Sequence, residues 1–182
     1  MVMVMTKDKE TKTIWLEEGL KFLATKGPSA LSIESLTLAT GKTKGSFYHH
    51  FSSRDNYIEA LLDYHEKNII DEVLERTYEV GDPSARLKKL TKLAFQISGE
   101  LELAIQAWAL YDPSVRTFQD RLDRRRLAYL KAMYIDSGIA PDKAETLSHR
   151  DYALFIGLQH LKHHHDEKQF RKILRTVFSG NI

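Results

Sequence analysis

The side chains best suited to binding lie in one short stretch, which reads Lys42-Thr43-Lys44-Gly45-Ser46-Phe47-Tyr48-His49. It combines lysine, hydroxyl and imidazole groups with a glycine that lets the backbone come close to a partner. Lysine and hydroxyl groups beside the free N–H groups of a helix N-terminus suit a phosphate backbone. The same helix face can enter the major groove of DNA. The stretch therefore indicates double-stranded DNA as a partner.

Two short helices must position these groups. Ser32 can cap the first helix, and Gly41 can adopt the positive φ that ends it. Thr43 can cap a second helix, expected over residues 44–50, whose phenylalanines face inward. Helices this short are unstable alone in water. They must dock on flanking helices, so we expect a compact three-helix unit.

The flanking helices are visible as apolar stripes. Residues 1 to about 10 are expected to form a frayed arm, followed by a helix over residues 9–26 that ends at Gly27-Pro28. After Phe51, Ser52 and Asp55 have the form of a capping box that opens a long, unbroken helix.

Gly41, the run 43–51 and Ser53-Arg54-Asp55 together resemble the DNA-binding signature of the TetR family of bacterial transcriptional regulators. Two positions depart from the usual pattern: Lys42 stands where an apolar residue is common, and Glu34 would repel a phosphate. These departures bear on the operator sequence more than on binding. The resemblance and the residue types predict DNA contacts from Lys42, Thr43, Lys44, Gly45, Ser46, Tyr48, His49 and Arg54.

The predicted fold is all-α, with about nine helices and no sheet, because no segment alternates with period two. We expect a helix-turn-helix DNA-binding domain over residues 1–54 and a helical effector-binding and dimerisation domain over residues 55–182. Asp82-Pro83, Asp112-Pro113 and Ala140-Pro141 mark helix starts in the second domain, and Gly99 is expected near a helix end.

In the resembled family the second domain surrounds a pocket for a small effector. The aromatic residues with polar tips and one methionine in this region suit such a pocket, although plain core packing is the simpler interpretation of any single one of them. Arg126 could receive an anionic group, but pairing with a nearby acid such as Asp120 or Asp123 is the simpler interpretation. The predicted pocket residues are Phe95, Trp108, Tyr111, Phe118, Arg126, Tyr129 and Met133.

The resemblance also implies that the last two helices join two subunits as a four-helix bundle. A dimer is what DNA reading needs, because one short helix buries too little surface for tight binding. Packing within the chain is the alternative. The predicted interface residues are Leu154, Gly157, Leu158, Leu161, Phe170, Ile173, Leu174 and Val177.

Composition narrows the function further. The net charge of +2 lies wholly in residues 1–56, which hold eight Lys/Arg against six Asp/Glu. This sign suits a nucleic-acid partner. The absence of cysteine excludes disulfides, thiolate zinc sites and cysteine nucleophiles. No apolar run has the length of a signal peptide core or a membrane span, so we expect a cytoplasmic protein.

The histidines of the 160–165 segment, followed by Asp166, are candidate metal ligands. No HExxH motif is present, and a solvated helix end is the simpler interpretation. We find no nucleophile elbow, phosphate-cradling loop or paired carboxylates, so we expect no enzyme, cofactor or metal. The predicted function is a homodimeric repressor that binds a palindromic operator and is modulated by a small-molecule effector. A ligand-independent or protein-partnered regulator, and a metal-dependent enzyme using His160–His165, remain alternatives.

Overall fold

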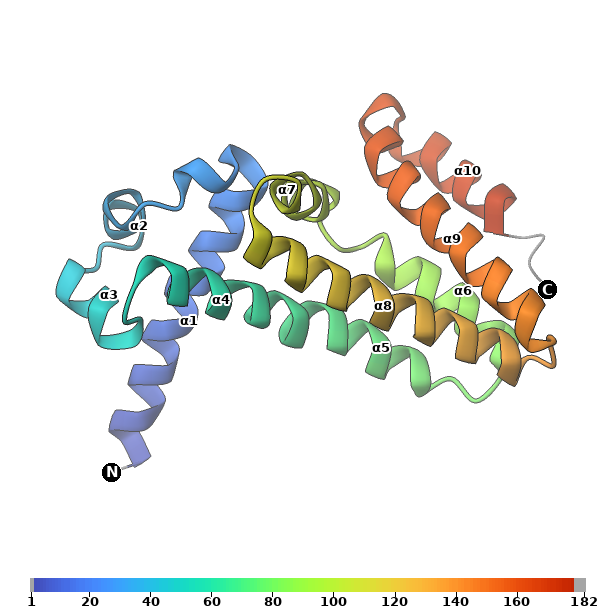
Figure 1. The fold of residues 1–182 in the computed structure, drawn as a ribbon, viewed down its shortest axis with the longest axis horizontal. Helices are drawn as coiled ribbons and strands as arrows, with labels where there is room; N and C mark the ends of the chain where they lie inside the picture. The colour runs from blue at the N-terminus through green and yellow to red at the C-terminus, as the bar shows by residue number, and fades with distance from the viewer. Residues whose placement is uncertain (1, 179–182) are drawn as a thin grey trace. The chain divides into compact units, whose positions relative to one another are not determined.

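The computed structural model describes residues 2–178, with the side chains of residues 8–83 and 85–178 (Figure 1). Over these residues the chain is helical and forms no strand, which confirms the predicted all-α fold. In order, the helices are α1 (Val2–Lys26), α2 (Ile33–Thr40), α3 (Lys44–His50), α4 (Arg54–His65), α5 (Asp71–Tyr78), α6 (Pro83–Ala94), α7 (Gly99–Ala109), α8 (Pro113–Asp136), α9 (Pro141–Leu161) and α10 (Glu167–Phe178).

The chain divides into two compact units, Met1–Ile69 and Ile70–Ile182. The sequence places the boundary at 54/55, whereas α4 belongs to the first unit because it packs against α1. Within this unit the Tyr57 hydroxyl of α4 donates a hydrogen bond to the Trp15 carbonyl of α1. In the described part of the chain, no helix combines the length and apolar character needed to cross a membrane.

An aromatic cluster forms the core of the first unit. Trp15, Phe47, Phe51 and Tyr57 are buried, and their ring centroids lie 5.0–5.4 Å apart in the pairs 15–47, 47–51, 47–57 and 51–57. Aromatic rings bury large apolar areas, so a few of them can hold short helices in place. This cluster fixes α3 against α1 and α4.

Three local expectations need correction. Helix α1 begins at Val2, so no frayed arm precedes it over the described residues. Helix α4 is capped by Ser53, which accepts from the Asn56 N–H, while Asn56 returns the bond by accepting from the Ser52 N–H. The capping box is therefore displaced by one residue. The prediction of one long, unbroken helix after Phe51 is also wrong, because a π-helical segment, Glu66–Ile70, separates α4 from α5.

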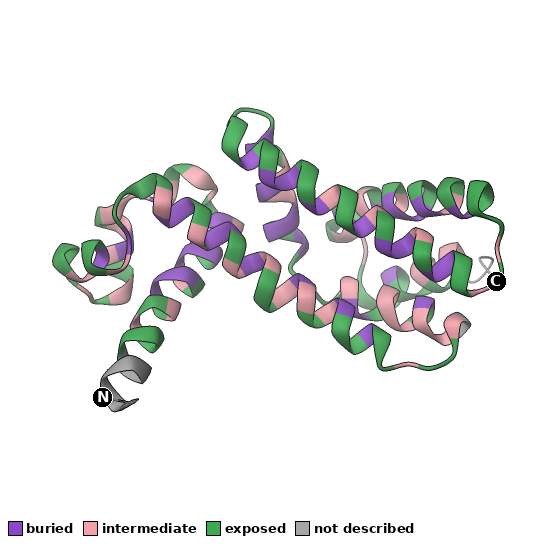
Figure 2. Ribbon diagram, turned by 60° about the horizontal axis from the view of Figure 1, so that its bottom comes forward, coloured by how far each residue is buried: buried purple, intermediate pink, exposed green. Residues whose placement is uncertain are grey.

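The second unit is a helical bundle in which α8 packs against α7 and α9, and α6 packs against α5 and α8. Figure 2 shows buried residues recurring along one side of the helices. Asp82 and Asp112 cap α6 and α8 as expected. Gly99 does not end a helix but begins α7, where a Cβ atom would lie 2.6 Å from the Gln159 amide oxygen. The glycine thus permits the close approach of α7 to α9.

Candidate functional site

The first candidate site is the corner between α2 and α3. Ser32 accepts a hydrogen bond from the Ser35 N–H at 3.1 Å, and Thr43 accepts one from the Ser46 N–H at the same distance. Gly41 ends α2 with a φ of 64°, in the left-handed region that glycine adopts without strain. Phe47, fully buried, anchors α3 from below. The caps, the turn and the anchor together hold the outer face of α3 in place.

The structure brings most of the predicted DNA contacts onto that outer face. Thr43, Lys44, Gly45, Tyr48 and His49 are exposed, and the Tyr48 side chain is 55% accessible although it is aromatic. Ser46 and Lys42 are half-buried beside them. Arg54, at the start of α4, is exposed, and its Nε donates to the Leu31 carbonyl at 3.1 Å.

An ion pair joins the two helices of this corner. The Lys44 ammonium donates to the Glu34 carboxylate, and both side chains are well exposed. This hydrogen bond lowers the pKa of Glu34 and raises the pKa of Lys44, each from its ordinary value. Glu34, which departs from the resembled pattern, therefore holds the ammonium group of an exposed lysine on this face.

A second cluster lies at the other end of α3. The Nε2 atom of His49 is 3.1 Å from the Asp8 Oδ1 atom of α1, and the Nδ1 atom of His50 is 3.7 Å from the same oxygen. Burial lowers the pKa of His50. No local sequence pattern predicts this cluster, because the pattern places Asp8 in a frayed arm. The pairing depends on α1 extending over residues that carry no apolar stripe.

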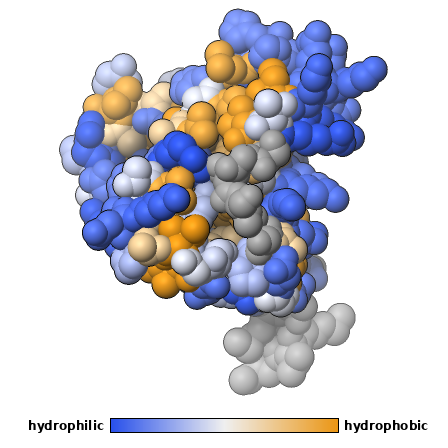
Figure 3. Space-filling view, turned by 90° about the vertical axis from the view of Figure 1, so that its right-hand side faces the viewer, coloured by the Kyte–Doolittle hydropathy of each residue, from blue (hydrophilic) through white to orange (hydrophobic). Residues whose placement is uncertain are grey.

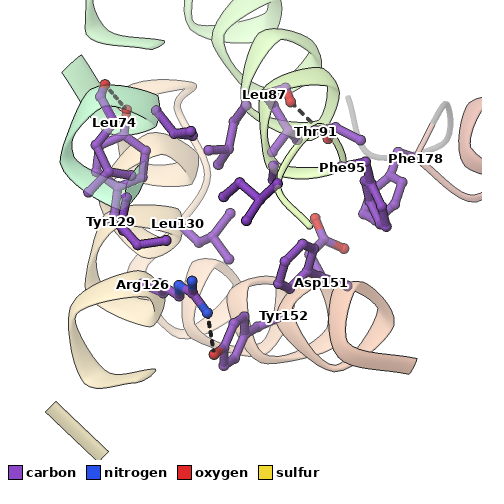
Figure 4. A pocket seen from close by; sticks show the side chains of 16 residues that line it. Leu74, Leu87, Thr91, Phe95, Arg126, Tyr129, Leu130, Asp151, Tyr152 and Phe178 are labelled. Atoms are coloured by element: carbon purple, nitrogen blue, oxygen red, sulfur yellow. Dashed lines mark hydrogen bonds between the residues drawn. The ribbon is translucent and has the colours of Figure 1, made fainter. Parts of the chain in front are cut away.

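In the second unit, a cavity of about 80 Å³ lies between α5, α6, α8 and α9 (Figure 4). Of the predicted pocket residues, it brings together Phe95, Arg126 and Tyr129. Burial raises the pKa of Tyr129 to about 12, and its hydroxyl donates to the Leu74 carbonyl. The remaining lining is mainly aliphatic and aromatic: Ile70, Val73, Leu74, Leu87, Leu90, Thr91, Ala94, Ile97, Leu130, Asp151, Tyr152, Phe155 and Phe178.

The other predicted pocket residues lie elsewhere. Trp108, Phe118 and Met133 are buried but do not line this cavity. Tyr111, at the end of α7, is 85% exposed. Sequence patterns distinguish buried from exposed aromatic residues poorly when a helix end intervenes, as it does at Ala109.

The charged groups at the cavity are already paired. Arg126 donates two hydrogen bonds to the Glu102 carboxylate, at 2.8 and 3.1 Å. Burial opposes its charge, but the Glu102 carboxylate outweighs this and raises the pKa of Arg126. Asp151 accepts from Tyr134 and, at 2.9 Å, from Arg150. The cavity therefore offers little uncompensated charge.

Glu102 corrects the expected partner of Arg126. Asp123 instead accepts from the Tyr152 hydroxyl at 2.6 Å, and Asp120 is exposed. A signal for Glu102 existed in the sequence: it lies three residues before Ile105, on the buried side of α7. A carboxylate in that position needs a cation.

The predicted interface residues fall into two groups. Leu158 and Phe170 are buried within their own unit, and Phe170 packs against Phe95 with ring centroids 5.7 Å apart. The others are accessible: Gly157 and Leu161 are exposed, and Leu154, Ile173, Leu174 and Val177 are half-buried. A Cβ atom at Gly157 would meet nothing within 4 Å.

The histidine-rich segment does not form a ligand cluster. His160, His163 and His164 are exposed and His165 is half-buried. Among the described residues, the group whose three ligand atoms converge is Asp8, His49 and His50 instead.

Comparison with known proteins agrees with this geometry. Residues 16–61 match the family described as bacterial regulatory proteins, tetR family. The matched region spans the C-terminal part of α1, all of α2 and α3, and most of α4. The transcriptional regulator AcuR of Cereibacter sphaeroides is 30% identical over 81 residues, which are 43% of this chain and 36% of that protein. The match thus spans about a third of the length of this curated relative.

Several solved structures share the fold over nearly the whole chain. The reduced form of NemR from E. coli has a TM-score of 0.75 at 17% identity, covering 93% of this chain and 96% of that one. A TetR regulator from Legionella pneumophila has a TM-score of 0.78 at 15% identity, with coverage of 93% and 95%. A transcriptional regulator from Saccharomonospora viridis, solved with choline, has a TM-score of 0.76 at 18% identity, with coverage of 96% and 98%. Residues 16–61 are thus similar to the tetR family of bacterial regulatory proteins, and the chain shares the helical fold of these solved structures over nearly its whole length.

Proposed function

We propose that this protein is a DNA-binding transcriptional regulator that represses genes by occupying an operator. The observation that carries the proposal is the outer face of α3, where Lys44, Tyr48 and His49 are exposed while Phe47 of the same helix is fully buried. A helix held this way from below presents a fixed set of donors. Helices so placed read base edges in the major groove.

The face divides into two roles. Lys44, Gly45, Ser46, Tyr48 and His49 approach the groove, with Thr43 acting as the cap that orders them. Lys42 and Arg54 lie at its margins and reach phosphates, which fix the position of the helix without reading sequence. In this proposal the protein acts in the cytoplasm, where it meets its operator DNA.

The test is fluorescence anisotropy with the DNA upstream of the protein's own gene, measured over a range of salt concentrations. A specific regulator binds this duplex about a thousandfold or more tightly than a random duplex. Lys42→Ala, which removes a proposed phosphate contact, weakens binding and lowers the salt slope by about one. Lys143→Ala, which removes an exposed lysine of α9, leaves both unchanged. Equal affinity for the two duplexes would refute the proposal.

Two copies of the chain act together in this proposal. The accessible apolar residues of α9 and α10, with open space at Gly157, suit an isologous contact between two subunits. The face in Figure 3 carries hydrophobic residues in patches separated by hydrophilic ones. Such a mixed surface is typical of an interface rim and core. Two α3 helices at a fixed separation read a palindromic operator.

The cavity of the second unit binds the effector. Its lining is apolar, Arg126 is neutralised by Glu102, and the Arg126 guanidinium also lies 5.8 Å from the Phe155 ring centroid. A charged ligand would meet no free countercharge, and a cationic one would compete with Arg126 for the aromatic face. We therefore expect a small, uncharged, largely apolar effector, in contrast to the choline bound by the Saccharomonospora viridis relative.

Thermal shift measurements distinguish an uncharged, apolar effector from a charged one. A ligand that prefers the folded state raises the melting temperature with its concentration. Small uncharged aromatic and aliphatic compounds should do so, while choline should not. Leu130→Trp, which fills the cavity, should abolish the shift and the effector's ability to weaken operator binding. A regulator without an effector would show no shift across the panel.

A further inference from the structure

One side-chain cluster is not explained by DNA binding or by the effector cavity. It lies in the first unit, where two neighbouring imidazoles of α3 and one carboxylate of α1 converge. The three ligand atoms all lie within 4.8 Å of one another. An ion pair of Asp8 with His49 would account for one imidazole alone. It leaves unexplained why the Nδ1 atom of His50 faces the same carboxylate oxygen.

The distances have the scale of a metal site. Zinc holds nitrogen and oxygen ligands at about 2.0–2.1 Å in a tetrahedron, so neighbouring ligand atoms lie roughly 3.3 Å apart. The two distances to the Asp8 oxygen, 3.1 Å from His49 and 3.7 Å from His50, fall on either side of this value. Imidazole nitrogen with carboxylate oxygen is also a donor set that zinc accepts.

We propose that Asp8, His49 and His50 bind a divalent transition-metal ion of the zinc type, with water as the fourth ligand. The ion would join the early part of α1 to the end of α3. It would also engage the Nε2 atom of His49, which then could not donate to DNA. This consequence rests on the proposed function, and it predicts that the metal weakens operator binding.

Calorimetric titration of the full chain with Zn²⁺, without DNA, tests the site itself. We expect one site per chain that Asp8→Asn weakens at least tenfold. Asp8 is 53% exposed at its side chain, so this variant should fold normally. His50→Gln should weaken binding equally, but His50 is only 5% exposed and the variant needs a circular dichroism check.

The exposed histidines of the second unit supply the matched control. The rings of His163 and His164 lie 4.0 Å apart, and replacing both with asparagine removes two histidines while leaving the proposed site intact. The double variant should keep the tight Zn²⁺ site. Equal Zn²⁺ affinity in Asp8→Asn and the parent, or loss of the site in the double variant, would overturn the proposal.

Measuring operator binding beside Zn²⁺ binding distinguishes a failure of the metal site from a failure of the proposed regulator. If the metal binds and operator DNA does not, the proposed regulator fails while the metal site stands. If operator DNA binds and Asp8→Asn leaves Zn²⁺ affinity unchanged, the metal site fails alone.

Discussion

The Tyr57 hydroxyl donates a hydrogen bond of 2.9 Å to the Trp15 carbonyl, across the surface of Gly19. A Cβ atom at Gly19 would lie 1.9 Å from the Tyr57 oxygen. The ring of Tyr57 is buried among Phe47 and Phe51 and has little room to move. The bond between α1 and α4 therefore requires glycine at this position.

Gly19→Ala should destabilise the first unit by about 1–3 kcal/mol through overpacking. Denaturant unfolding followed by Trp15 fluorescence in a Trp108→Phe background isolates this unit, since the chain has two tryptophans. Gly45→Ala is the control, because its Cβ would lie 3.7 Å from the nearest atom outside its own backbone. Identical midpoints for Gly19→Ala and its parent would contradict the packing described.

The Lys44–Glu34 pair predicts a variant that binds DNA more tightly. Glu34→Gln frees the Lys44 ammonium and removes a charge that repels phosphate. Exposed ion pairs are weak and are screened by salt, so we expect a gain in affinity of about a few-fold at low salt, shrinking as salt rises. Anisotropy titrations measure it. Glu59→Gln changes the net charge equally on α4 and should give a smaller gain; equal gains would mean that total charge matters and the pair does not.

The sequence predicts local features of this chain well. Ser32, Thr43, Asp82 and Asp112 cap the helices expected of them, because a cap bonds N–H groups two or three residues away. Gly41 is equally local, since its φ depends on its own lack of a side chain. Ser32, Gly41 and Thr43 suffice to place α2 and α3, and with them the candidate DNA-binding face.

Pairs between distant elements were missed for the opposite reason. His49 and Asp8 are 41 residues apart, and Arg126 and Glu102 are 24 apart. Nothing in either local pattern determines which acid pairs with which base, and Asp120 and Asp123 lie nearer to Arg126 in the sequence than Glu102 does. The same holds for the cavity, whose lining comes from α5, α6, α8 and α9 together with Phe178.

The buried Arg126–Glu102 pair predicts a strongly asymmetric response to mutation. Glu102→Gln should cost about 3–5 kcal/mol, because it leaves a buried guanidinium uncompensated. Replacing both residues, as Arg126→Met with Glu102→Leu, should restore most of the loss. Chemical unfolding followed by Trp108 fluorescence in a Trp15→Phe background measures both. Glu100→Gln, an exposed change on the same helix, should stay within about 0.5 kcal/mol. A double variant no more stable than the single one would show that the pair contributes more than neutralisation.

Asp112 predicts a dependence on pH. The Ser114 hydroxyl, followed by backbone N–H groups at the start of α8, lowers the pKa of Asp112 below its ordinary value of 3.8. A lowered folded pKa gives stability that is complete above 3.8 and is lost as the pH falls through the lowered value. Asp112→Asn retains a capping oxygen without a charge, so its melting temperature should fall less steeply in acid. Asp112→Ala should lose about 1 kcal/mol already at neutral pH. Parallel acid curves for Asp112→Asn and the parent would exclude this role.

The open space at Gly157 predicts how to separate the subunits. Gly157→Arg places a long charged side chain where nothing of the same chain lies within 4 Å, so each chain should fold normally. Across an isologous contact the change occurs twice, and the two like charges repel near the symmetry axis. If the proposed dimer forms through this face, sedimentation velocity should show a dimer for the parent and a monomer for Gly157→Arg, with operator affinity reduced at least tenfold. Thr117→Arg adds the same charge at an exposed position of α8 and should remain dimeric. If Gly157→Arg sediments as a dimer with an unchanged circular dichroism spectrum, the subunits meet through a different face.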